Sequence, residues 1–140
     1  HKIFNRFTFF RNTLTMKALI NLLLISTLLL PFYACKKNQT GGKATLKGTV
    51  KHHDKPIADA YVYIKFNATE FPGDSYTLYD TYVQADESGN YAIPLYKGSY
   101  YVYAVGRDLE IAYPFEVKGG FSFSIRNKEN LVKDIAVTED

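Results

Sequence analysis

The chain has 140 residues, of which 46% are apolar, and this length and composition fit one globular domain with room for a targeting segment. Four of the 17 basic residues precede position 35 and all 14 acidic residues follow it, so the chain beyond residue 35 carries a net charge of 13 − 14 = −1. This balance removes the basic-patch argument for nucleic-acid binding, and the single cysteine excludes an internal disulfide.

The first predicted element is a hydrophobic targeting segment. Residues 18–30 read ALINLLLISTLLL, which matches the apolar core of a secretory signal and is shorter than the roughly 20 residues that span a bilayer. Lys17 supplies the positive charge that precedes such a core, and Met16 is placed to be the initiator. Residues 1–15 are then either an upstream extension read in frame or a long basic n-region.

The next feature is Cys35, which ends the sequence FYAC at residues 32–35. This sequence resembles a bacterial lipobox, which implies that the cysteine thiol is acylated with chains such as palmitate. Residues 16–34 are therefore predicted to be a lipoprotein signal peptide, and residues 35–43 the lipidated cysteine with a flexible tether. Two or more acyl chains would hold the protein firmly, because each buried methylene contributes about 0.8 kcal/mol. A plain secretory signal with an incidental cysteine is the alternative.

Beyond residue 43, apolar and polar residues alternate in short runs between turn residues, which predicts β-strands. In chain order, the expected strands cover residues 44–51, 58–66, 76–85, 91–95, 99–105, 111–117, 121–125 and 130–138. The strand over 111–117 is expected at a sheet edge, because Pro114 lacks a backbone donor. The residues expected to face the core in the first two strands are Ala44, Leu46, Gly48, Val50, Ala60, Val62, Ile64 and Phe66.

The sequence after Cys35 contains no useful amphipathic helical run. The pattern therefore predicts an all-β fold, a roughly seven-stranded antiparallel β-sandwich of the immunoglobulin-like or transthyretin-like kind. The predicted sandwich covers residues 44–138 and follows the signal segment.

Four motifs within this region carry a family resemblance. They are LKGTV (46–50), KPIADAYVYI (55–64), ADESGNYAI (85–93) and KGSYYVYAVG (97–106). Together they resemble the carboxypeptidase regulatory-like domain, a transthyretin-like sandwich that is also described as carbohydrate-binding-like. The positions that match the family pattern are Gly48, Val50, Pro56, Ile57, Ala60, Val62, Asp86, Gly89, Tyr91, Gly98, Tyr100, Val102 and Ala104.

The resemblance implies a binding or accessory module, because this domain accompanies carboxypeptidases without carrying their zinc chemistry. Similar modules occur in bacterial surface proteins and at the start of outer-membrane receptors. A short lipoprotein with only this domain resembles those of Bacteroidetes-type bacteria.

Tyrosines form the candidate binding surface. Tyr61, Tyr63, Tyr101 and Tyr103 are expected to point outward from two strands that could be neighbours in one sheet. An exposed aromatic surface can stack on sugar rings or anchor a protein partner. Cross-strand aromatic pairing that only stabilises the sheet is the alternative, and the absence of tryptophan weakens the sugar interpretation.

The adjacent residues His52, His53 and Asp54 are interpreted as a solvated turn, because neighbouring histidines on a strand point apart and cannot converge on one metal. No cofactor or metal is therefore predicted. The fold also raises a hydrolase alternative, since transthyretin-like hydroxyisourate hydrolases end in a YRGS-type sequence and use separated histidines. This chain has YKGS internally, at residues 96–99, and ends in VTED. It also lacks separated histidines to polarise water.

These observations lead to one functional hypothesis. The protein is predicted to be a non-enzymatic binding or assembly module of the bacterial cell envelope, anchored to the outer membrane through Cys35. Its domain is expected on the periplasmic face, because Lys36 and Lys37 show no acidic export tag. The expected partners are the membrane and either a glycan or an outer-membrane protein. Carbohydrate binding through the tyrosines and a transthyretin-like hydrolase activity are the alternatives.

Overall fold

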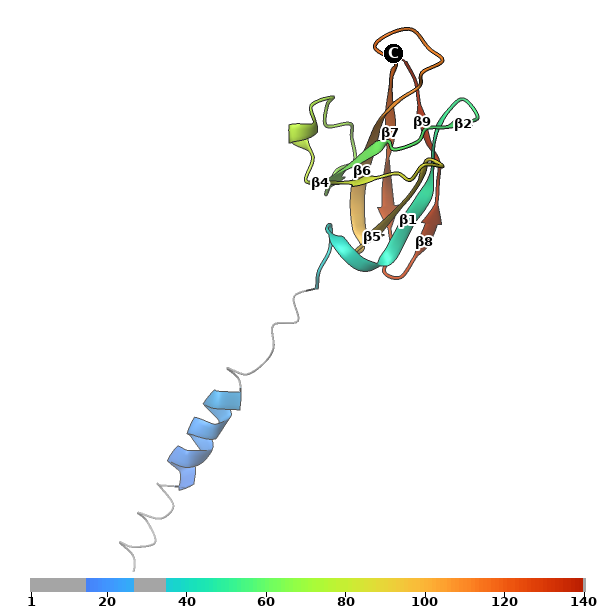
Figure 1. Cartoon of the computed structure of the whole chain (residues 1–140). Helices are drawn as coiled ribbons and strands as arrows, with labels where there is room; N and C mark the ends of the chain where they lie inside the picture. The colour runs from blue at the N-terminus through green and yellow to red at the C-terminus, as the bar shows by residue number, and fades with distance from the viewer. Residues whose placement is uncertain (1–14, 27–34, 140) are drawn as a thin grey trace, which may run out of the picture. The chain divides into compact units, whose positions relative to one another are not determined.

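The computed structural model describes residues 15–26 and 35–139, which belong to two compact units, His1–Cys35 and Lys36–Asp140 (Figure 1). In the first unit, residues 15–26 form a helix. None of the helices formed by the described residues combines the length and the apolar character needed to cross a bilayer. The predictions for residues 1–14 and for lipobox residues 32–34 lie outside the described residues.

The described residues of the second unit form strands and one short 3₁₀ helix. Their bounds are β1 (Thr40–His52), β2 (Lys55–Pro56), β3 (Tyr61–Phe66), η1 (Tyr76–Leu78), β4 (Thr81–Gln84), β5 (Asn90–Leu95), β6 (Gly98–Arg107), β7 (Glu116–Ile125), β8 (Asn130–Val132) and β9 (Ile135–Val137).

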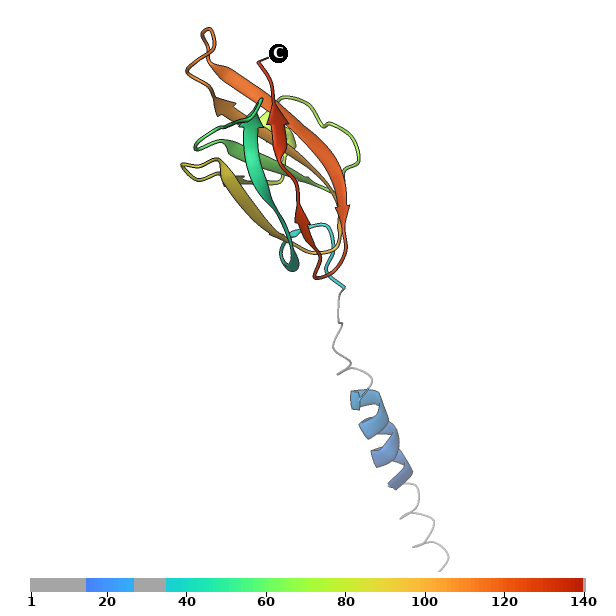
Figure 2. The same ribbon diagram turned by 90° about the vertical axis from the view of Figure 1, so that its right-hand side faces the viewer.

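The strands form two facing sheets, which confirms the predicted all-β sandwich (Figures 1 and 2). One sheet has the order β4-β3-β6-β7, and every pair in it is antiparallel. In the other sheet, β1 pairs antiparallel with β2 and β5 but parallel with β8 and β9. The parallel pairs differ from the antiparallel expectation. They arise because the chain leaves β7 near the start of β1, crosses to the other sheet and then runs along β1.

The core lies between the sheets and confirms the predicted alternation of buried side chains. Leu46, Val50, Val62 and Ile64 have no exposed surface. The whole cluster of buried core residues comes from residues 44–137, within the unit Lys36–Asp140. This unit therefore carries its own core and can fold without the preceding residues.

The predicted strand over residues 76–85 is only partly formed. In the turn η1, the Leu78 amide donates to the Ser75 carbonyl oxygen at 3.0 Å. The Asp80 carboxylate accepts a 2.7 Å hydrogen bond from the Phe66 amide at the end of β3. Local hydrogen bonds satisfy this backbone, so the strand is confined to the shorter β4.

Residues 111–117, predicted as an edge strand, lie mostly in a loop, and β7 continues through Gly119 and Gly120. These glycines lie between the two strands that were expected over residues 111–117 and 121–125. A Cβ on Gly119 would lie 2.2 Å from the Ala136 backbone oxygen, so glycine is needed here because β9 passes close to β7. Gly119 therefore marks a close approach of the two sheets and not a strand end, whereas a Cβ on Gly120 would lie 2.0 Å from the Val102 backbone oxygen of β6, within the same sheet.

The tether predicted over residues 35–43 is shorter in the structure, because β1 begins within it. The Asn38 amide donates to the Lys97 carbonyl oxygen at 3.0 Å, and the Asn38 side-chain oxygen accepts a 2.9 Å hydrogen bond from the Ser99 amide. Within the predicted tether, residues 35–37 precede this attachment to the domain.

Candidate functional site

The predicted tyrosines lie on the outer side of the four-stranded sheet. β3 and β6 are neighbours, and their register pairs Tyr63 with Tyr103 and Lys65 with Tyr101. Tyr61 lies two residues before Tyr63 and therefore on the same side of the sheet. The register brings the four predicted tyrosines together.

Tyr103 was expected to be exposed, and this expectation is wrong: only 4% of its surface is accessible. The centres of the Phe71 and Tyr79 rings lie 5.2 and 5.7 Å from the centre of its ring. Its hydroxyl group donates a 2.7 Å hydrogen bond to Asp74 Oδ1. Alternation identifies the side of the sheet on which Tyr103 lies, but not the loop after β3 that covers it.

Three tyrosines that sequence reasoning missed complete the cluster. The centre of the Tyr63 ring lies 5.8 Å from that of Tyr79 and 6.0 Å from those of Tyr76 and Tyr82. The Tyr61 ring stacks on Tyr63 with their ring centres 6.3 Å apart. Of these three, Tyr82 could have been found from the sequence, because it lies in a predicted strand; in the structure it pairs with Tyr63 across β3 and β4. We call the full set of rings the aromatic face: Tyr61, Tyr63, Phe71, Tyr76, Tyr79, Tyr82, Tyr101 and Tyr103.

Two depressions meet at Tyr61. The first, of about 380 Å³, is lined by Tyr61, Tyr63, Tyr76, Tyr79, Asp80, Thr81 and Tyr82. The second, of about 560 Å³, is lined by Ala58, Asp59, Tyr61, Val105, Gly106, Arg107, Leu109 and Glu116. Tyr61 is 43% exposed, and Tyr76 and Tyr82 are 68% and 58% exposed. The surface therefore offers accessible rings beside hollowed regions.

The tyrosine rings of this surface are amphipathic, and charged side chains, among them Asp80 and Arg107, lie beside them. Burial raises the pKa of the Tyr63 hydroxyl above its ordinary value, and the neighbouring hydroxyl groups of Tyr61, Tyr76 and Tyr82 act in the same direction. Tyr63 is therefore uncharged at neutral pH. An uncharged tyrosine presents an apolar ring together with a hydroxyl group that can donate or accept a hydrogen bond. Such a surface suits a ligand with apolar faces and hydroxyl or amide edges.

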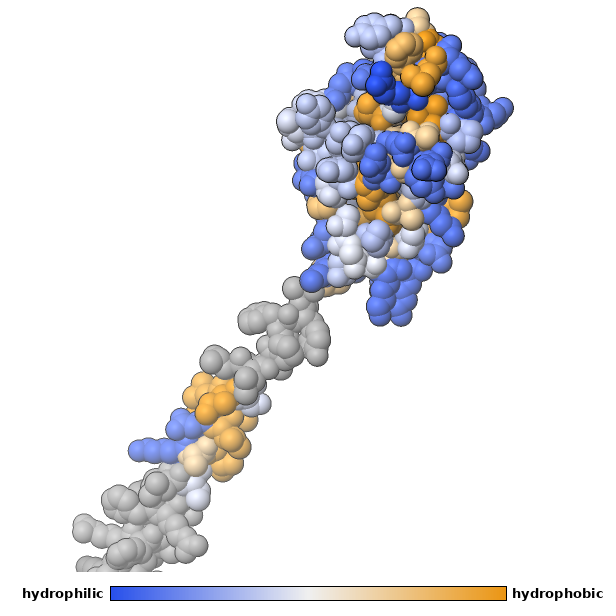
Figure 3. All heavy atoms as spheres, viewed as in Figure 1, coloured by the Kyte–Doolittle hydropathy of each residue, from blue (hydrophilic) through white to orange (hydrophobic). Residues whose placement is uncertain are grey.

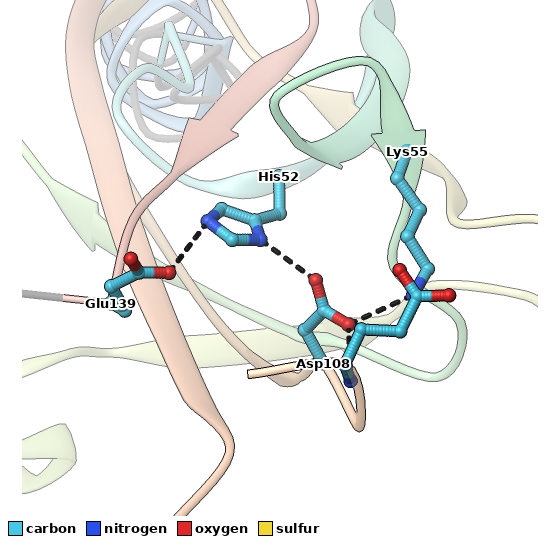
Figure 4. Close-up of polar contacts among 5 residues, drawn as sticks. His52, Lys55, Asp108 and Glu139 are labelled. Carbon is cyan, nitrogen blue, oxygen red and sulfur yellow. Dashed lines mark hydrogen bonds and ion pairs between the residues drawn. The ribbon is translucent and has the colours of Figure 1, made fainter. Parts of the chain in front are cut away.

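A second cluster lies at the end of β1, and it corrects the interpretation of His52 as part of a solvated turn (Figure 4). His52 is buried, with 5% of its surface exposed, whereas His53 is exposed. The His52 Nδ1 atom lies 2.7 Å from Asp108 Oδ2, and Nε2 lies 3.1 Å from Glu139 Oε2. Because β1 continues through His52, alternation carries this side chain inward and away from the turn.

The buried carboxylate of Asp108 organises this second cluster. It accepts a 2.8 Å hydrogen bond from Lys55 Nζ and a 3.0 Å hydrogen bond from the Glu110 amide. The hydrogen bonds from Lys55 and then from His52 hold the pKa of Asp108 well below its usual range. The contacts join the end of β1, β2, the loop after β6 and the segment after β9, so the cluster fastens one end of the sandwich.

The histidine cluster shows little of the geometry needed for hydrolysis or metal binding. Both ring nitrogens of His52 face carboxylate oxygens, so neither points into open space. The residues that the structure describes contain no group of three or more His, Cys, Asp or Glu arranged to hold a metal ion. In the YKGS sequence, the Tyr96 carbonyl oxygen accepts a 2.6 Å hydrogen bond from the Tyr100 hydroxyl group. The contact between Asn38 and Ser99 holds the same turn, so these residues have structural roles.

Cys35 is exposed and is not part of either cluster. Comparisons with known proteins give no further assignment. No model of a known protein family matches the chain, and no curated protein is significantly similar to it.

Proposed function

We propose that the protein is a lipid-anchored, non-enzymatic binding or assembly module of the bacterial cell envelope. In this proposal Cys35 is acylated in the outer membrane and the domain faces the periplasm. The motif resemblance to the carboxypeptidase regulatory-like domain is part of the proposal, and the β-sandwich supports it. The aromatic face supports the binding role, because exposed aromatic clusters of this kind commonly mark interaction sites.

The observation that carries the proposal is the position of Tyr61. Its ring lines both depressions, one beside the other tyrosines and one at the end of β3 and β6. A ligand that occupied either depression would contact this ring, and a longer ligand could contact it from both sides. An aromatic side chain at the centre of a contact surface commonly contributes a large share of the binding free energy.

The binding proposal predicts a specific effect of Tyr61→Ala. Tagged wild-type and variant chains would be used to capture partners from detergent-solubilised envelopes, and each recovered partner would be titrated against both chains. We expect the substitution to weaken binding more than about tenfold, because it removes the ring shared by the two depressions.

The matched control is Tyr113→Ala. Tyr113 is 83% exposed but lies in the loop after β6, outside the aromatic face. This control should bind like the wild-type chain. Equal binding by the wild-type chain and Tyr61→Ala would rule out a role for this surface.

Carbohydrate binding is the second candidate, and the neutral hydroxyl-bearing rings favour it. A sugar presents an apolar face that can stack on a ring and hydroxyl groups that can bond to its edge. Calorimetric titration with envelope and dietary polysaccharides tests this candidate. Heat that is lost in Tyr61→Ala and kept in Tyr113→Ala would support it. No heat with any of these polysaccharides would remove it.

The anchor proposal makes a separate prediction about Cys35. Intact-protein mass spectrometry of the chain expressed in a bacterial host should show loss of the residues before Cys35 and the added mass of acyl chains. The Cys35→Ser variant should lack that added mass, because serine has no thiol to acylate. An unprocessed and unacylated wild-type chain would contradict the anchor.

A further inference from the structure

The charge of the domain is unevenly distributed between its two ends. Six exposed basic side chains belong to the segments that meet where β1 begins. The lower end of the domain in Figure 3, where these segments lie, is strongly hydrophilic. We call this set the basic end: Lys36, Lys37, Lys43, Lys97, Arg126 and Lys128.

Backbone contacts bring these segments together. The Asn38 amide donates to the Lys97 carbonyl oxygen at 3.0 Å, which joins the segment before β1 to the turn between β5 and β6. The Thr45 amide donates to the Glu129 carbonyl oxygen at 2.8 Å, which joins β1 to the turn between β7 and β8. The pairing of Gly98 with Ile125 places these two turns next to each other. The six basic residues therefore share one end of the sandwich.

Acidic side chains do not cancel this charge. Glu129, the acidic residue of the turn between β7 and β8, accepts a 2.7 Å hydrogen bond from the Arg126 amide. At the opposite end, Asp54, Asp108, Glu110 and Glu139 line one depression together with His52 and Lys55. The net charge of the chain beyond residue 35 is close to zero, although one end of the domain is basic and the other is more acidic.

The basic end is also the part of the domain that directly follows Cys35 in the chain. Lys36 and Lys37 are the residues between Cys35 and Asn38, whose main-chain and side-chain contacts hold it to the domain. The three Cα-to-Cα steps from Cys35 to Asn38 span at most about 11 Å. The Debye length, over which salt screens a charge, is about 10 Å at 0.1 M, so a spacer this short keeps the basic end at about that distance from an anchoring membrane.

We propose that the basic end docks on the headgroups of anionic phospholipids, and that it orients the domain on the membrane in which Cys35 is anchored. The orientation part rests on the lipid anchor proposed above, whereas the affinity for an anionic surface belongs to the domain alone. Each lysine or arginine near such a surface strengthens binding by about fivefold, so a cluster of six can act as a second attachment beside the acyl chains.

The test uses residues Lys36–Asp140, which hold the complete core, and vesicles of phosphatidylcholine with or without phosphatidylglycerol. The domain should sediment with the anionic vesicles and not with the neutral ones, and added salt should release it. The double variant Lys97→Gln/Lys128→Gln should lower the partition coefficient about 10- to 30-fold.

The matched control is Lys47→Gln/Lys133→Gln. It removes the same charge from Lys47, midway along β1, and from Lys133, in the segment between β8 and β9 beside it, where the Lys133 amide bonds to the Lys47 carbonyl oxygen at 2.8 Å. The control should lower the partition coefficient far less than the double variant of the basic end. Equal loss in both variants, or equal binding to neutral and anionic vesicles, would overturn the proposal. Since the tested domain lacks Cys35, a failure of the anchor proposal would not change this result.

Discussion

At the residue scale, Asp108 shows how one buried charge can fasten several segments. Its carboxylate bonds to His52, Lys55 and the Glu110 amide, and 4% of its surface is exposed. A carboxylate that is removed from water needs such partners, because an unpaired buried charge is strongly destabilising. The ionised form of Asp108 is therefore part of the folded state.

Asp108 gives a prediction for stability against pH. Its pKa is lower in the folded chain than in the unfolded chain, so its contribution is present above about pH 4 and is lost as the pH falls further. Asp108→Asn should lower the urea midpoint at pH 7 and should flatten the decline in acid. Urea unfolding followed by circular dichroism from neutral to acidic pH checks this.

Asp54→Asn is the control, since Asp54 is an exposed carboxylate in the neighbouring turn. It should leave the acid decline close to that of the wild-type chain. Parallel pH profiles for the wild-type chain and Asp108→Asn would contradict the role assigned to Asp108.

At the scale of elements, β1 organises the five-stranded sheet by pairing with four other strands. Close approach to the segment between β8 and β9 imposes glycine at position 48, where a Cβ would lie 2.1 Å from the Lys133 backbone oxygen. The alternation of β1 was readable from sequence, but this contact joins residues far apart in the chain. The reason for glycine is therefore visible only in the assembled sheet.

Gly48→Ala should lower the free energy of unfolding of the domain by about 1–3 kcal/mol, because the added methyl group must displace backbone atoms. Denaturant unfolding of Lys36–Asp140 measures the difference. Lys47→Ala at the adjacent, exposed position is the control and should change stability by less than about 0.5 kcal/mol. If Gly48→Ala and Lys47→Ala unfolded at the same denaturant concentration, the neighbouring backbone would make room for a methyl group at no cost. That result would contradict the role assigned to Gly48.

At the scale of the whole domain, the two ends of the sandwich have different chemistry. The basic end surrounds the start of β1, and the histidine cluster surrounds the end of that strand. The nine residues from Ala44 to His52, which follow an irregularity in β1, extend about 30 Å, so the two ends are well separated. The aromatic face lies along the side of the four-stranded sheet, between them.

The fold class and the orientation of strand residues were determined by the sequence alone. Strict alternation in residues 44–51 and 58–66 fixes which side chains can share one side of a sheet, because neighbouring residues of a strand point to opposite sides. The buried positions of Leu46, Val62 and Val102 follow directly from it. The lipobox-like pattern that ends at Cys35 could also be read from adjacent residues, and the acylation that it implies stays a prediction.

Only the tertiary structure decided what covers each surface. It places Phe71 and Tyr79 over Tyr103, directs His52 to Asp108, and gathers the six residues of the basic end from separate segments of the chain. These contacts join positions far apart in the chain. Local alternation and turn preferences act over a few residues, so they specify the side on which a residue lies but not its distant partner.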